Sequence, residues 1–264
     1  MKEKTCVVTG SASGVGRATA VLLGQLGATV IGVDLDGPGG EQTAALVTAS
    51  GGTALFVHGD VADEKTIAAA QGLVRHTGGH LAMLFNNAAE VVPDEVDTAT
   101  ADVWNRLLAV NVTAPMRWSQ AFAPALGSPP PGAIVNHSSI DGILGNPHFA
   151  SYSVSKSALE GLTRVMVHTY GRIGIRVNSI VSGNLSQTTS STRWRDTGLD
   201  GDANLWAARQ RSVLEETPLR RVGTVEDAAQ LAVFLASDAA RFVSGAAILL
   251  TGGRGVLTPG TTRL

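Results

Sequence analysis

The sequence is short of cysteine, of net charge and of long apolar runs, and each shortage excludes a class of protein. Its 264 residues include one cysteine, Cys6, so a framework of disulfide bonds is excluded. Lysine and arginine together number 20 against 22 aspartate and glutamate residues, and without a dense basic run nucleic acid is not expected as a partner. Because no apolar stretch approaches the ~20 residues of a membrane-spanning helix, we expect no membrane partner either.

The beginning of the chain also lacks the features of a secretory signal, namely an apolar core followed by a small-residue cleavage site. Instead, residues 1–9 carry lysines and pass directly into a short apolar run, so we expect a cytoplasmic protein. Hydrophobic residues make up 44% and charged residues 16% of the chain, as in ordinary globular proteins. The uniform composition predicts one domain over residues 1–264.

Short apolar runs with the length of buried strands recur along the chain. Helix-length segments with apolar residues every three or four positions separate most of them, as at residues 16–26, 67–76 and 225–235. This alternation predicts a single-domain α/β fold, a Rossmann-type doubly wound parallel sheet of about seven strands with helices on both faces. The ligand is expected beyond the carboxyl ends of the strands. The expected strands are residues 6–8, 30–33, 54–57, 81–85, 133–136, 175–180 and 246–250.

Two stretches interrupt this alternation. Residues 124–132 include three consecutive prolines and predict a turn-rich connector between a helix and the next strand. Residues 183–217 form a longer insertion, in which Trp194 and Trp206 accompany serines, threonines and arginines. We interpret this insertion as a substrate-binding lid. Its two tryptophans are either pocket walls for a cyclic substrate or anchors of the lid.

A glycine-rich turn follows the first expected strand and opens a helix. Residues 9–16 read TGSASGVG, with glycines that permit a tight turn, close approach of a pyrophosphate to the backbone and close packing of the helix. The N-terminus of the helix adds oriented N–H groups that attract an anion. The turn predicts a dinucleotide site formed by Gly10, Ser13, Gly14, Val15 and Gly16.

An aspartate, Asp34, ends the next expected strand, about twenty residues beyond the glycine turn. A carboxylate in this place accepts hydrogen bonds from the hydroxyls of the adenosine ribose and repels a 2′-phosphate. Neither Ser13 nor Leu35, where a basic side chain would be expected to hold such a phosphate, is charged. Asp34 therefore predicts NAD rather than NADP as the cofactor.

A tyrosine and a lysine stand four residues apart in the segment 152–156, which reads YSVSK. On a helix this spacing places the phenol and the ammonium on one face. A tyrosine that acts as a base near neutrality needs a pKa lowered from about 10 to about 7, and a nearby ammonium and the positive nicotinamide ring of NAD⁺ both act in that direction. Tyr152 and Lys156 are therefore candidates for proton transfer.

The order of these motifs resembles the short-chain dehydrogenase/reductase family, and the resemblance extends from Lys4 to about Gly253. It implies that Asp60 and Val61, after the third expected strand, contact the adenine of the cofactor. The turn after the fourth expected strand reads NNAA and is similar to the NNAG turn of the family. The resemblance implies cofactor contacts there from Asn87, Ala88 and Ala89, the last in place of the family's glycine.

The same resemblance implies the roles of the catalytic residues. Ser139 lies thirteen residues before Tyr152, as in the family, and would hold the substrate oxygen, with Ser138 as the alternative. In alcohol oxidation Tyr152, as phenolate, would remove the hydroxyl proton while a hydride passes to the nicotinamide. Lys156 would also hold the nicotinamide ribose. Asn111 would hold a water leading to Lys156, so that these two residues relay the proton outward.

The family pattern is broken after the sixth expected strand, where Ser182 replaces the usual proline. Gly183 and Leu185 remain candidates to present their backbone to the nicotinamide. The last expected strand is followed by Thr251 before two glycines, where the family has aspartate. The residues that stay open as further contacts of the carboxamide or pyrophosphate are Ser186, Gln187 and Thr188.

Two histidines, His137 and His148, flank the proposed site. Their spacing fits no common zinc motif, so we expect no metal. Both are expected to pack or to line the substrate pocket without taking part in catalysis.

Together these features predict an NAD-dependent oxidoreductase that interconverts a secondary alcohol and a ketone. The substrate is expected to be partly apolar, with cyclic compounds among the candidates. The second hypothesis is a sugar or polyol dehydrogenase of the same family, with polar contacts from Asp141, Asn146, His148, Asn184 and the arginines of the lid. The third, a non-catalytic scaffold that senses NAD, is disfavoured because all four catalytic positions are filled.

The expected helices around residues 111–123 and 152–170 carry apolar residues on more than one face. That is more apolar surface than a monomer should expose. Because members of the family commonly pair these helices, the resemblance implies a homotetramer.

Overall fold

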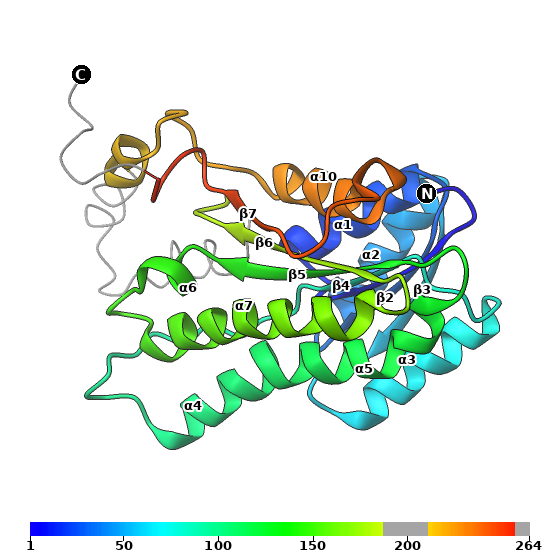
Figure 1. Ribbon diagram of the computed structural model, residues 1–264, viewed down its shortest axis with the longest axis horizontal. Coiled ribbons are helices and arrows are strands. Elements are labelled where there is room, and N and C mark those ends of the chain that lie inside the picture. Colours follow the sequence, from blue (N-terminus) through cyan, green and yellow to red (C-terminus); the bar gives the residue numbers. More distant parts are fainter. Residues whose placement is uncertain (187–210, 257–264) are drawn as a thin grey trace.

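The apolar runs of the sequence form one parallel sheet in the computed structural model, which describes residues 1–186 and 211–256 (Figure 1). The strands are β1 (Thr5–Thr9), β2 (Thr29–Asp34), β3 (Thr53–His58), β4 (Met83–Asn86), β5 (Ala133–Ser139), β6 (Arg176–Ser182) and β7 (Ala247–Leu250). The sheet has seven strands in the order β3-β2-β1-β4-β5-β6-β7. Every pairing is parallel, which confirms the predicted doubly wound α/β fold.

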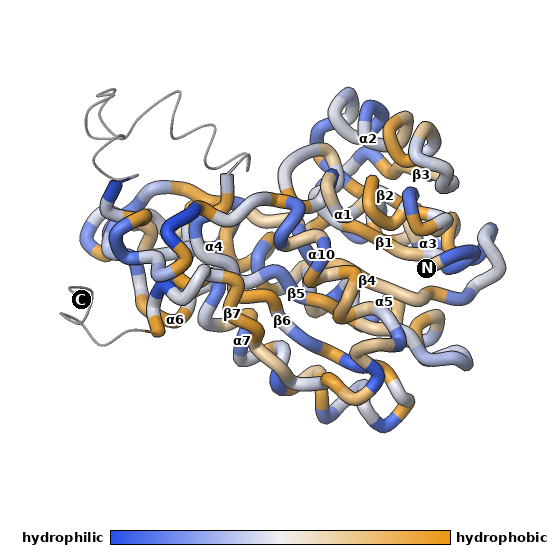
Figure 2. The backbone as a smooth tube through the Cα atoms, turned by 90° about the horizontal axis from the view of Figure 1, so that it is seen from above, coloured by the Kyte–Doolittle hydropathy of each residue, from blue (hydrophilic) through white to orange (hydrophobic). Residues whose placement is uncertain are grey.

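Strand β1 shows why these segments form buried strands. All of its residues are buried, with Cys6 and Val8 in the apolar core on one face of the sheet and Val7 in the core on the other. Successive side chains of a strand alternate between faces, so a strand covered on both faces is apolar at nearly every position. The hydrophobic residues of the central strands appear as orange stretches inside the molecule in Figure 2.

Helices cover both faces of the sheet. The helices α1, α2 and α10 lie on one face, and α3, α5 and α7 lie on the other (Figure 1). Leu23 of α1 and Ala228 of α10 pack in the first layer, whereas Trp118 and Phe122 of α5 pack in the second. The helices are α1 (Gly14–Gln25), α2 (Gly37–Ala49), α3 (Glu64–His76), α4 (Ala101–Leu108), α5 (Ala114–Gly127), α6 (Asp141–Leu144), α7 (Ala150–Gly171) and α10 (Val225–Ala236), with a π-helical turn η1 (Ala109–Thr113) between α4 and α5 and a 3-10 turn η2 (Asp238–Ala240) after α10.

The direction of the connections reverses at the centre of the sheet. From β1 the chain builds outward through β2 to β3, and it then returns to form β4 on the other side of β1. The connections that follow β1 and β4 therefore run to opposite sides of the sheet, and ligands of such sheets usually bind beyond the strand ends at this point. The predicted site residues follow the carboxyl ends of these strands and of β2, β3, β5 and β6.

Two details differ from the sequence prediction. Strand β5 does not end at residue 136 but continues to Ser139, because Ser139 pairs in register with Ser182 at the end of β6. The predicted connector 124–132 is too long, since α5 includes Pro124 and ends at Gly127. Leu126 is fully buried in the core, and this burial favours a last helical turn beyond the proline.

The predicted lid, residues 183–217, lies mostly outside the described part of the chain. Its ends, residues 183–186 and 211–217, are described, but Trp194 and Trp206 are not. The lid therefore stays a prediction. Within residues 1–186 and 211–256, none of the helices has both the length and the apolarity of a membrane span.

Candidate active site

The glycine turn after β1 has a backbone that requires glycine. Gly10 and Gly14 have φ angles of +68° and +53°, in the left-handed region. A Cβ atom on Gly10 would lie 2.8 Å from the Cα of Ala88, and one on Gly16 would lie 1.9 Å from the carbonyl oxygen of Gly10. The turn leads into α1 with Ser13 at its N-cap and Val15 in its first turn. Its shape and the N–H groups of the helix N-terminus fit a pyrophosphate.

Asp34 holds its carboxylate over the glycine turn. One oxygen accepts the N–H of Ala12 at 2.8 Å, and the other accepts the N–H of Asp36 at 2.9 Å. The carboxylate is thus fixed at the end of β2 beside the glycine turn, which is the position that a contact with the adenosine ribose requires. Arg17, the nearest cation along α1, directs its guanidinium to the hydroxyl of Thr43 at 3.0 Å and to the carbonyl oxygen of Ala12.

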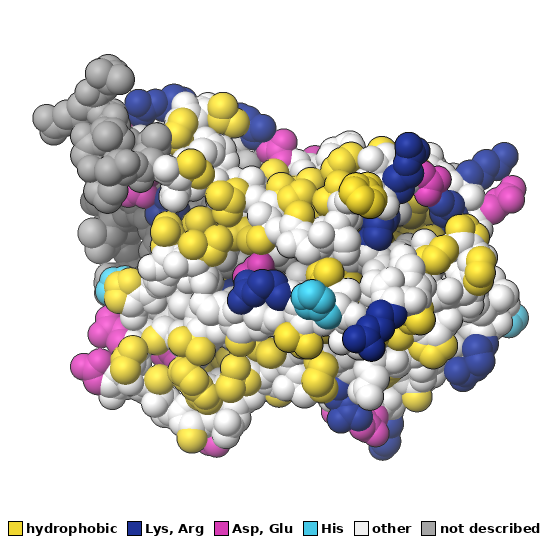
Figure 3. Space-filling model, viewed as in Figure 1, with side chains coloured by type: hydrophobic (Ala, Val, Ile, Leu, Met, Phe, Trp, Pro, Cys, Tyr) yellow, Lys and Arg dark blue, Asp and Glu magenta, His cyan; other side chains and the backbone are white. Residues whose placement is uncertain are grey.

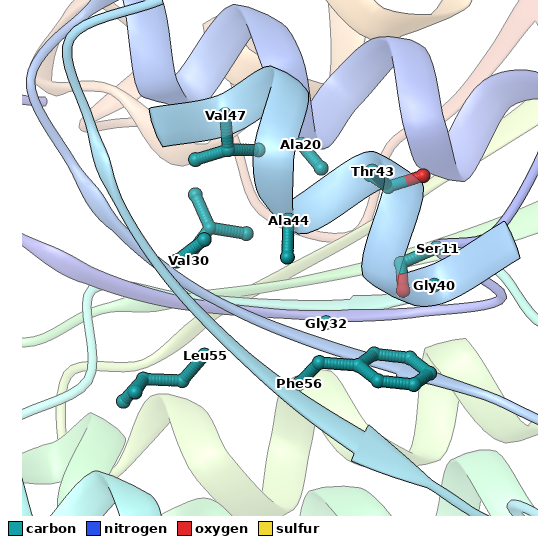
Figure 4. Close-up of a pocket in the computed structure, with 11 residues that line it drawn as sticks. Ser11, Ala20, Val30, Gly32, Gly40, Thr43, Ala44, Val47, Leu55 and Phe56 are labelled. Atoms are coloured by element: carbon teal, nitrogen blue, oxygen red, sulfur yellow. The ribbon is translucent and has the colours of Figure 1, made fainter. Parts of the chain in front are cut away.

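A small cavity lies next to this turn, between α2 and the sheet. It measures about 10 Å³, no more than a single water molecule needs, and is lined mainly by apolar side chains (Figure 4). The buried hydroxyl of Ser11 borders it and has no hydrogen-bond partner among residues 1–186 and 211–256. The cavity lies beneath the predicted dinucleotide site and away from Tyr152, so it is not the substrate pocket.

Asp60 belongs to an ion-pair cluster that the sequence did not reveal. Arg106 of α4 donates from Nη1 to Asp60 and from Nε to Glu90, each at 2.7 Å. Partial burial opposes the positive charge, but the hydrogen bonds to the two carboxylates raise the pKa of Arg106 above its ordinary value. The neighbour of Asp60, Val61, is held by its carbonyl oxygen, which accepts the indole N–H of Trp118 at 2.9 Å.

The turn after β4 is fastened to the glycine turn. The side-chain nitrogen of Asn87 donates to the carbonyl oxygens of Thr9 at 2.9 Å and Gly10 at 3.2 Å. The hydroxyl of Thr9 accepts the N–H groups of Asn87 and Ala88. Ala89, which replaces the glycine of the family, is exposed, so its methyl group meets no obstacle.

Asn111 lies within the π-helical turn η1 and is almost fully buried. Its side-chain nitrogen donates to the carbonyl oxygen of Glu90 at 2.9 Å and to the hydroxyl of Ser155 at 3.0 Å, while its oxygen accepts the N–H of Glu90 at 2.9 Å. Both side-chain N–H groups are therefore engaged in joining η1 to α7 and to the segment after β4.

Tyr152 and Lys156 lie on adjacent turns of α7, with the Nζ atom of Lys156 5.6 Å from the centroid of the tyrosine ring. Lys156 is 3% exposed and donates to the carbonyl oxygen of His137 at 2.7 Å. Burial lowers the pKa of Lys156 to about 8, although the charge of Glu160 acts in the opposite direction. The ammonium is thus held at the end of β5, where the structure also places Ser139.

The electrostatics of Tyr152 differ from the prediction. Burial raises the pKa of Tyr152 above its ordinary value, and the carboxylate of Asp141 adds to the rise, while a hydrogen bond with Ser139 lowers it. The net direction is upward, because desolvation of the phenolate outweighs the favourable contacts. The structure does bring Ser139 and Tyr152 together, as the sequence interval predicted.

The segment after β6 is anchored on both sides. The N–H of Gly183 donates to the carbonyl oxygen of Leu250 in β7 at 2.9 Å. Leu185 is 6% exposed and forms an isolated bridge with Gly223, whose carbonyl oxygen also accepts the N–H of Ser186 at 2.9 Å. Of the three residues left open as further cofactor contacts, Gln187 and Thr188 lie outside the described residues.

Asp94 is another residue that the sequence gave no reason to single out. Its carboxylate accepts the N–H of Ser151 at 3.1 Å and the hydroxyl of the same serine. Its backbone forms a bridge with Phe149, and its carbonyl oxygen accepts the N–H of Ala150. Asp94 therefore caps α7 from a distant part of the chain, directly before Tyr152.

The two histidines near the site have different surroundings. His137 is partly buried between strand ends, whereas His148 is exposed and pairs with Glu95, with 2.9 Å between Nδ1 and the carboxylate oxygen. In the part of the chain that the structure describes, no three or more histidine, cysteine, aspartate or glutamate side chains are grouped so that they could hold a metal ion.

The fold and the glycine turn are those of a Rossmann-type oxidoreductase. The family model described as enoyl-(acyl carrier protein) reductase matches residues 10–254. The chain belongs to the short-chain dehydrogenase/reductase family.

Similar proteins act on substrates that carry a hydroxyl group. The chain is 35% identical over 253 residues to 2-(S)-hydroxypropyl-CoM dehydrogenase 3 of Xanthobacter autotrophicus, covering 96% of this chain and 97% of that protein. It is 35% identical over 255 residues to cis-4-hydroxycyclohexanecarboxylate dehydrogenase of Sinomonas cyclohexanicum, covering 95% and 96%. The solved structure of an NAD⁺-bound xylitol dehydrogenase is similar with a TM-score of 0.88 at 27% identity, covering 96% of this chain and 99% of that one. The chain is thus an oxidoreductase of the alcohol-dehydrogenase type.

Proposed function

We propose that the protein interconverts a secondary alcohol and a ketone with NAD as cofactor and Tyr152 as the general acid and base. The observation that carries this proposal is the meeting of Ser139, Tyr152 and Lys156 beyond the carboxyl end of β5. The phenol and the ammonium lie on one face of α7, with Nζ of Lys156 5.6 Å from the centroid of the tyrosine ring. The glycine turn suited to a dinucleotide follows β1, on the other side of β4 in the sheet.

The residues at the carboxyl ends of the strands fit NAD. The glycine turn has the shape for the pyrophosphate, and the fixed carboxylate of Asp34 suits two ribose hydroxyls. When bound, NAD accepts a hydride in the oxidation or supplies one in the reduction, and its oxidised ring adds a positive charge. The residues that would hold it are Gly10, Ser13, Gly14, Val15, Gly16, Asp34, Asp60, Val61, Asn87, Ala88, Ala89, Tyr152, Lys156, Gly183 and Leu185.

The chain's own groups divide the proton chemistry between them. Ser139 holds the substrate oxygen, and Tyr152 gives a proton to that oxygen in ketone reduction or removes one in alcohol oxidation. Because burial keeps Tyr152 protonated, the protein alone favours the donating form. For the oxidation, positive charge must offset that burial, and Lys156 supplies part of it. Asn111 and Lys156 would pass the proton outward.

The surface beside Tyr152 suits a partly apolar substrate. Ile143 and Leu144 of α6 are 54% and 57% exposed. A Cβ atom on Gly255 would lie 3.0 Å from a methyl group of Ile140, so the chain near its end packs over the same apolar wall. These side chains favour a hydrocarbon or ring over a fully hydroxylated chain.

A polyol substrate is the second candidate, and one observation favours it. His148 and Glu95 are exposed, with 59% and 55% of their side-chain surface accessible, and they form a polar pair close to α7. The pair could receive hydroxyl groups. Of the other predicted polar contacts, Asn184 already accepts a hydrogen bond from Arg254 at 3.3 Å.

Turnover with a panel of cyclic secondary alcohols and linear polyols, each with NAD⁺ and with NADP⁺, tests these proposals. We expect activity with NAD⁺ and the cyclic alcohols. Asp34→Ala should raise the KM for NAD⁺ about tenfold, because hydrogen bonds to a charged group are lost. It should also lower the ratio of kcat/KM with NAD⁺ to kcat/KM with NADP⁺. Asp36→Ala is the matched control, because its carboxylate caps α2. Binding of NADH without turnover of any carbonyl would overturn the proposed catalysis.

A further inference from the structure

A partly buried imidazole connects three neighbouring strand ends beside the candidate active site. His137 of β5 places Nδ1 2.9 Å from the side-chain oxygen of Asn87 and Nε2 3.0 Å from the hydroxyl of Ser182. Its ring stacks on Phe85, with the two centroids 6.0 Å apart. Ser182 stands where the family resemblance predicts proline, so the imidazole contacts the chain at the point where it departs from the family pattern.

The hydrogen-bond partners determine which ring nitrogen carries the hydrogen. The amide nitrogen of Asn87 must face the carbonyl oxygens of Thr9 and Gly10, because both are acceptors. The amide oxygen therefore faces His137, and Nδ1 must be the donor. Nε2 is then an acceptor. The single hydrogen of the Ser182 hydroxyl has two acceptors, Nε2 of His137 at 3.0 Å and the carbonyl oxygen of Ser138 at 3.3 Å, and Nε2 is the nearer.

His137 also remains uncharged. Burial and, to a smaller extent, the nearby charge of Lys156 lower the pKa of His137 to about 3. The imidazole is therefore neutral at every pH at which the enzyme is expected to work. It is not placed to exchange protons with a substrate, and its two hydrogen bonds do not change with pH.

The backbone of His137 completes the connection to the site. Its carbonyl oxygen holds the Nζ atom of Lys156 at 2.7 Å. Asn87 in turn holds the glycine turn through Gly10, and Ser182 precedes Gly183, a predicted nicotinamide contact. One continuous set of hydrogen bonds thus runs across the ends of β1, β4, β5 and β6.

We propose that His137 is a positioning residue, whose neutral imidazole with hydrogen on Nδ1 fixes Asn87, Ser182 and Lys156 relative to one another. Its hydrogen bond with Ser182 restrains the segment after β6, which in the family is restrained by a proline at this position. The proposal rests on the proposed function only for the identity of the ligand that these residues receive.

The opposite face of the same strand offers a matched control. Asn136 accepts from the side chain of Asn86 at 2.8 Å and donates to the hydroxyl of Thr163 at 2.9 Å. This set of bonds is more deeply buried than that of His137 and faces α5 and α7, on the other side of the sheet. Thr163→Val removes the bond from Asn136 and the bond that the hydroxyl donates to the carbonyl oxygen of Leu159 at 2.8 Å, with little change in side-chain volume.

The experiment compares His137→Phe, Ser182→Ala, the double variant and Thr163→Val. His137→Phe keeps a ring to stack on Phe85 but leaves Asn87 and Ser182 without their imidazole partner. We expect about tenfold weaker NADH binding, measured by fluorescence, and at least about tenfold lower kcat/KM. The shape of the pH profile should not change. The double variant should lose no more than His137→Phe alone, since the partner is already absent.

Two results would overturn the proposal. The first is that His137→Phe behaves like Thr163→Val. Both variants would then unfold at a lower urea concentration than the wild-type protein, with unchanged NADH affinity and unchanged kcat/KM. The second is a neutron structure of the wild-type protein with hydrogen on Nε2 of His137. If His137→Phe fails to fold, Ser182→Ala and the neutron structure still decide the question. A wild-type protein that binds no NADH would contradict the proposed function instead, and the neutron structure would test His137 independently.

Discussion

Tyr152 and Lys156 share a poorly solvated space, and burial moves their pKa values toward the uncharged forms. The pKa of the phenol is raised, and that of the ammonium is lowered to about 8. Both shifts follow from desolvation, which disfavours any charge. The phenol of Tyr152 therefore keeps its proton, whereas the ammonium of Lys156 loses its charge at moderately alkaline pH.

This difference predicts the pH dependence of ketone reduction. Lys156 is charged below pH of about 8 and neutral above it, whereas Tyr152 stays protonated over the same range. We expect kcat/KM for ketone reduction to fall above about pH 8, measured between pH 6 and pH 10. Lys156→Arg keeps its charge throughout and should shift the fall to higher pH. A fall at the same pH in both proteins would exclude Lys156 as its cause.

The tyrosine and the lysine should also separate in their effects on binding and turnover. Tyr152→Phe removes the acid and base, so turnover should fall by about 10² to 10⁴ while NAD affinity stays close to wild type. Lys156→Ala should reduce both, because the lysine is also predicted to hold the nicotinamide ribose. Steady-state kinetics and NADH titration measure the two effects. Turnover retained in Tyr152→Phe would refute the mechanism.

At the scale of secondary-structure elements, α7 depends on a residue outside it. Phe149, at its N-cap position, makes no capping hydrogen bond with its side chain, and Asp94 supplies the missing acceptor from the segment after β4. A carboxylate at a helix N-terminus also interacts favourably with the helix dipole. The cap holds the first turn of α7, which carries Tyr152.

Removal of this cap should lower both stability and turnover. Asp94→Ala is expected to reduce the free energy of unfolding by ~1 kcal/mol, as for other N-cap residues, and to lower kcat more than it changes the KM for NAD⁺. Asp94→Asn keeps an acceptor and should recover most of both losses. Urea unfolding and steady-state kinetics provide the measurements. Equal kcat values in Asp94→Ala and wild type would show that the cap does not position Tyr152.

The features that could be predicted from the sequence are those that depend on residues close together in the chain. The strands appear as apolar runs, and the glycine turn appears as a fixed spacing of Gly10, Gly14 and Gly16. Arg106 and Asp94 could not be found in this way, because their partners lie far away along the chain. The continuation of β5 to Ser139 likewise follows from pairing with β6, which no pattern within β5 records. The direction of the Tyr152 pKa was missed because burial depends on the folded surroundings.

At the scale of the whole molecule, the exposed apolar side chains indicate contact between copies of the chain. Met116 of α5 and Val165 of α7 are 41% and 62% exposed, and Phe242, near the edge strand β7, is fully exposed. Figure 3 shows hydrophobic side chains gathered over the α4 and α7 side and again near β7 and α10. Two separate apolar surfaces permit two kinds of pairing, as a homotetramer requires.

We therefore predict a homotetramer, with a mass four times that of the chain in light scattering. Substitution of a charged residue into one of the two apolar surfaces should dissociate the tetramer into dimers, because the chains still pair through the other surface. Val165→Glu tests the surface on α7, with Gln42→Glu at an exposed position of α2 as a control that adds the same single charge. A mass near 27.1 kDa for the wild-type protein would refute the prediction.

The π-helical turn η1 joins α4 and α5 into one continuous helix whose two halves contact different parts of the protein. On its first half Arg106 reaches Asp60 and Glu90, and on its second half Trp118 packs into the core. Each residue turns an α-helix by about 100°, so the wider turn sets the angle between the two halves. Loss of a single residue there would rotate Arg106 away from its partners even if every side chain were kept. At this point the number of residues in the chain matters as much as their identity.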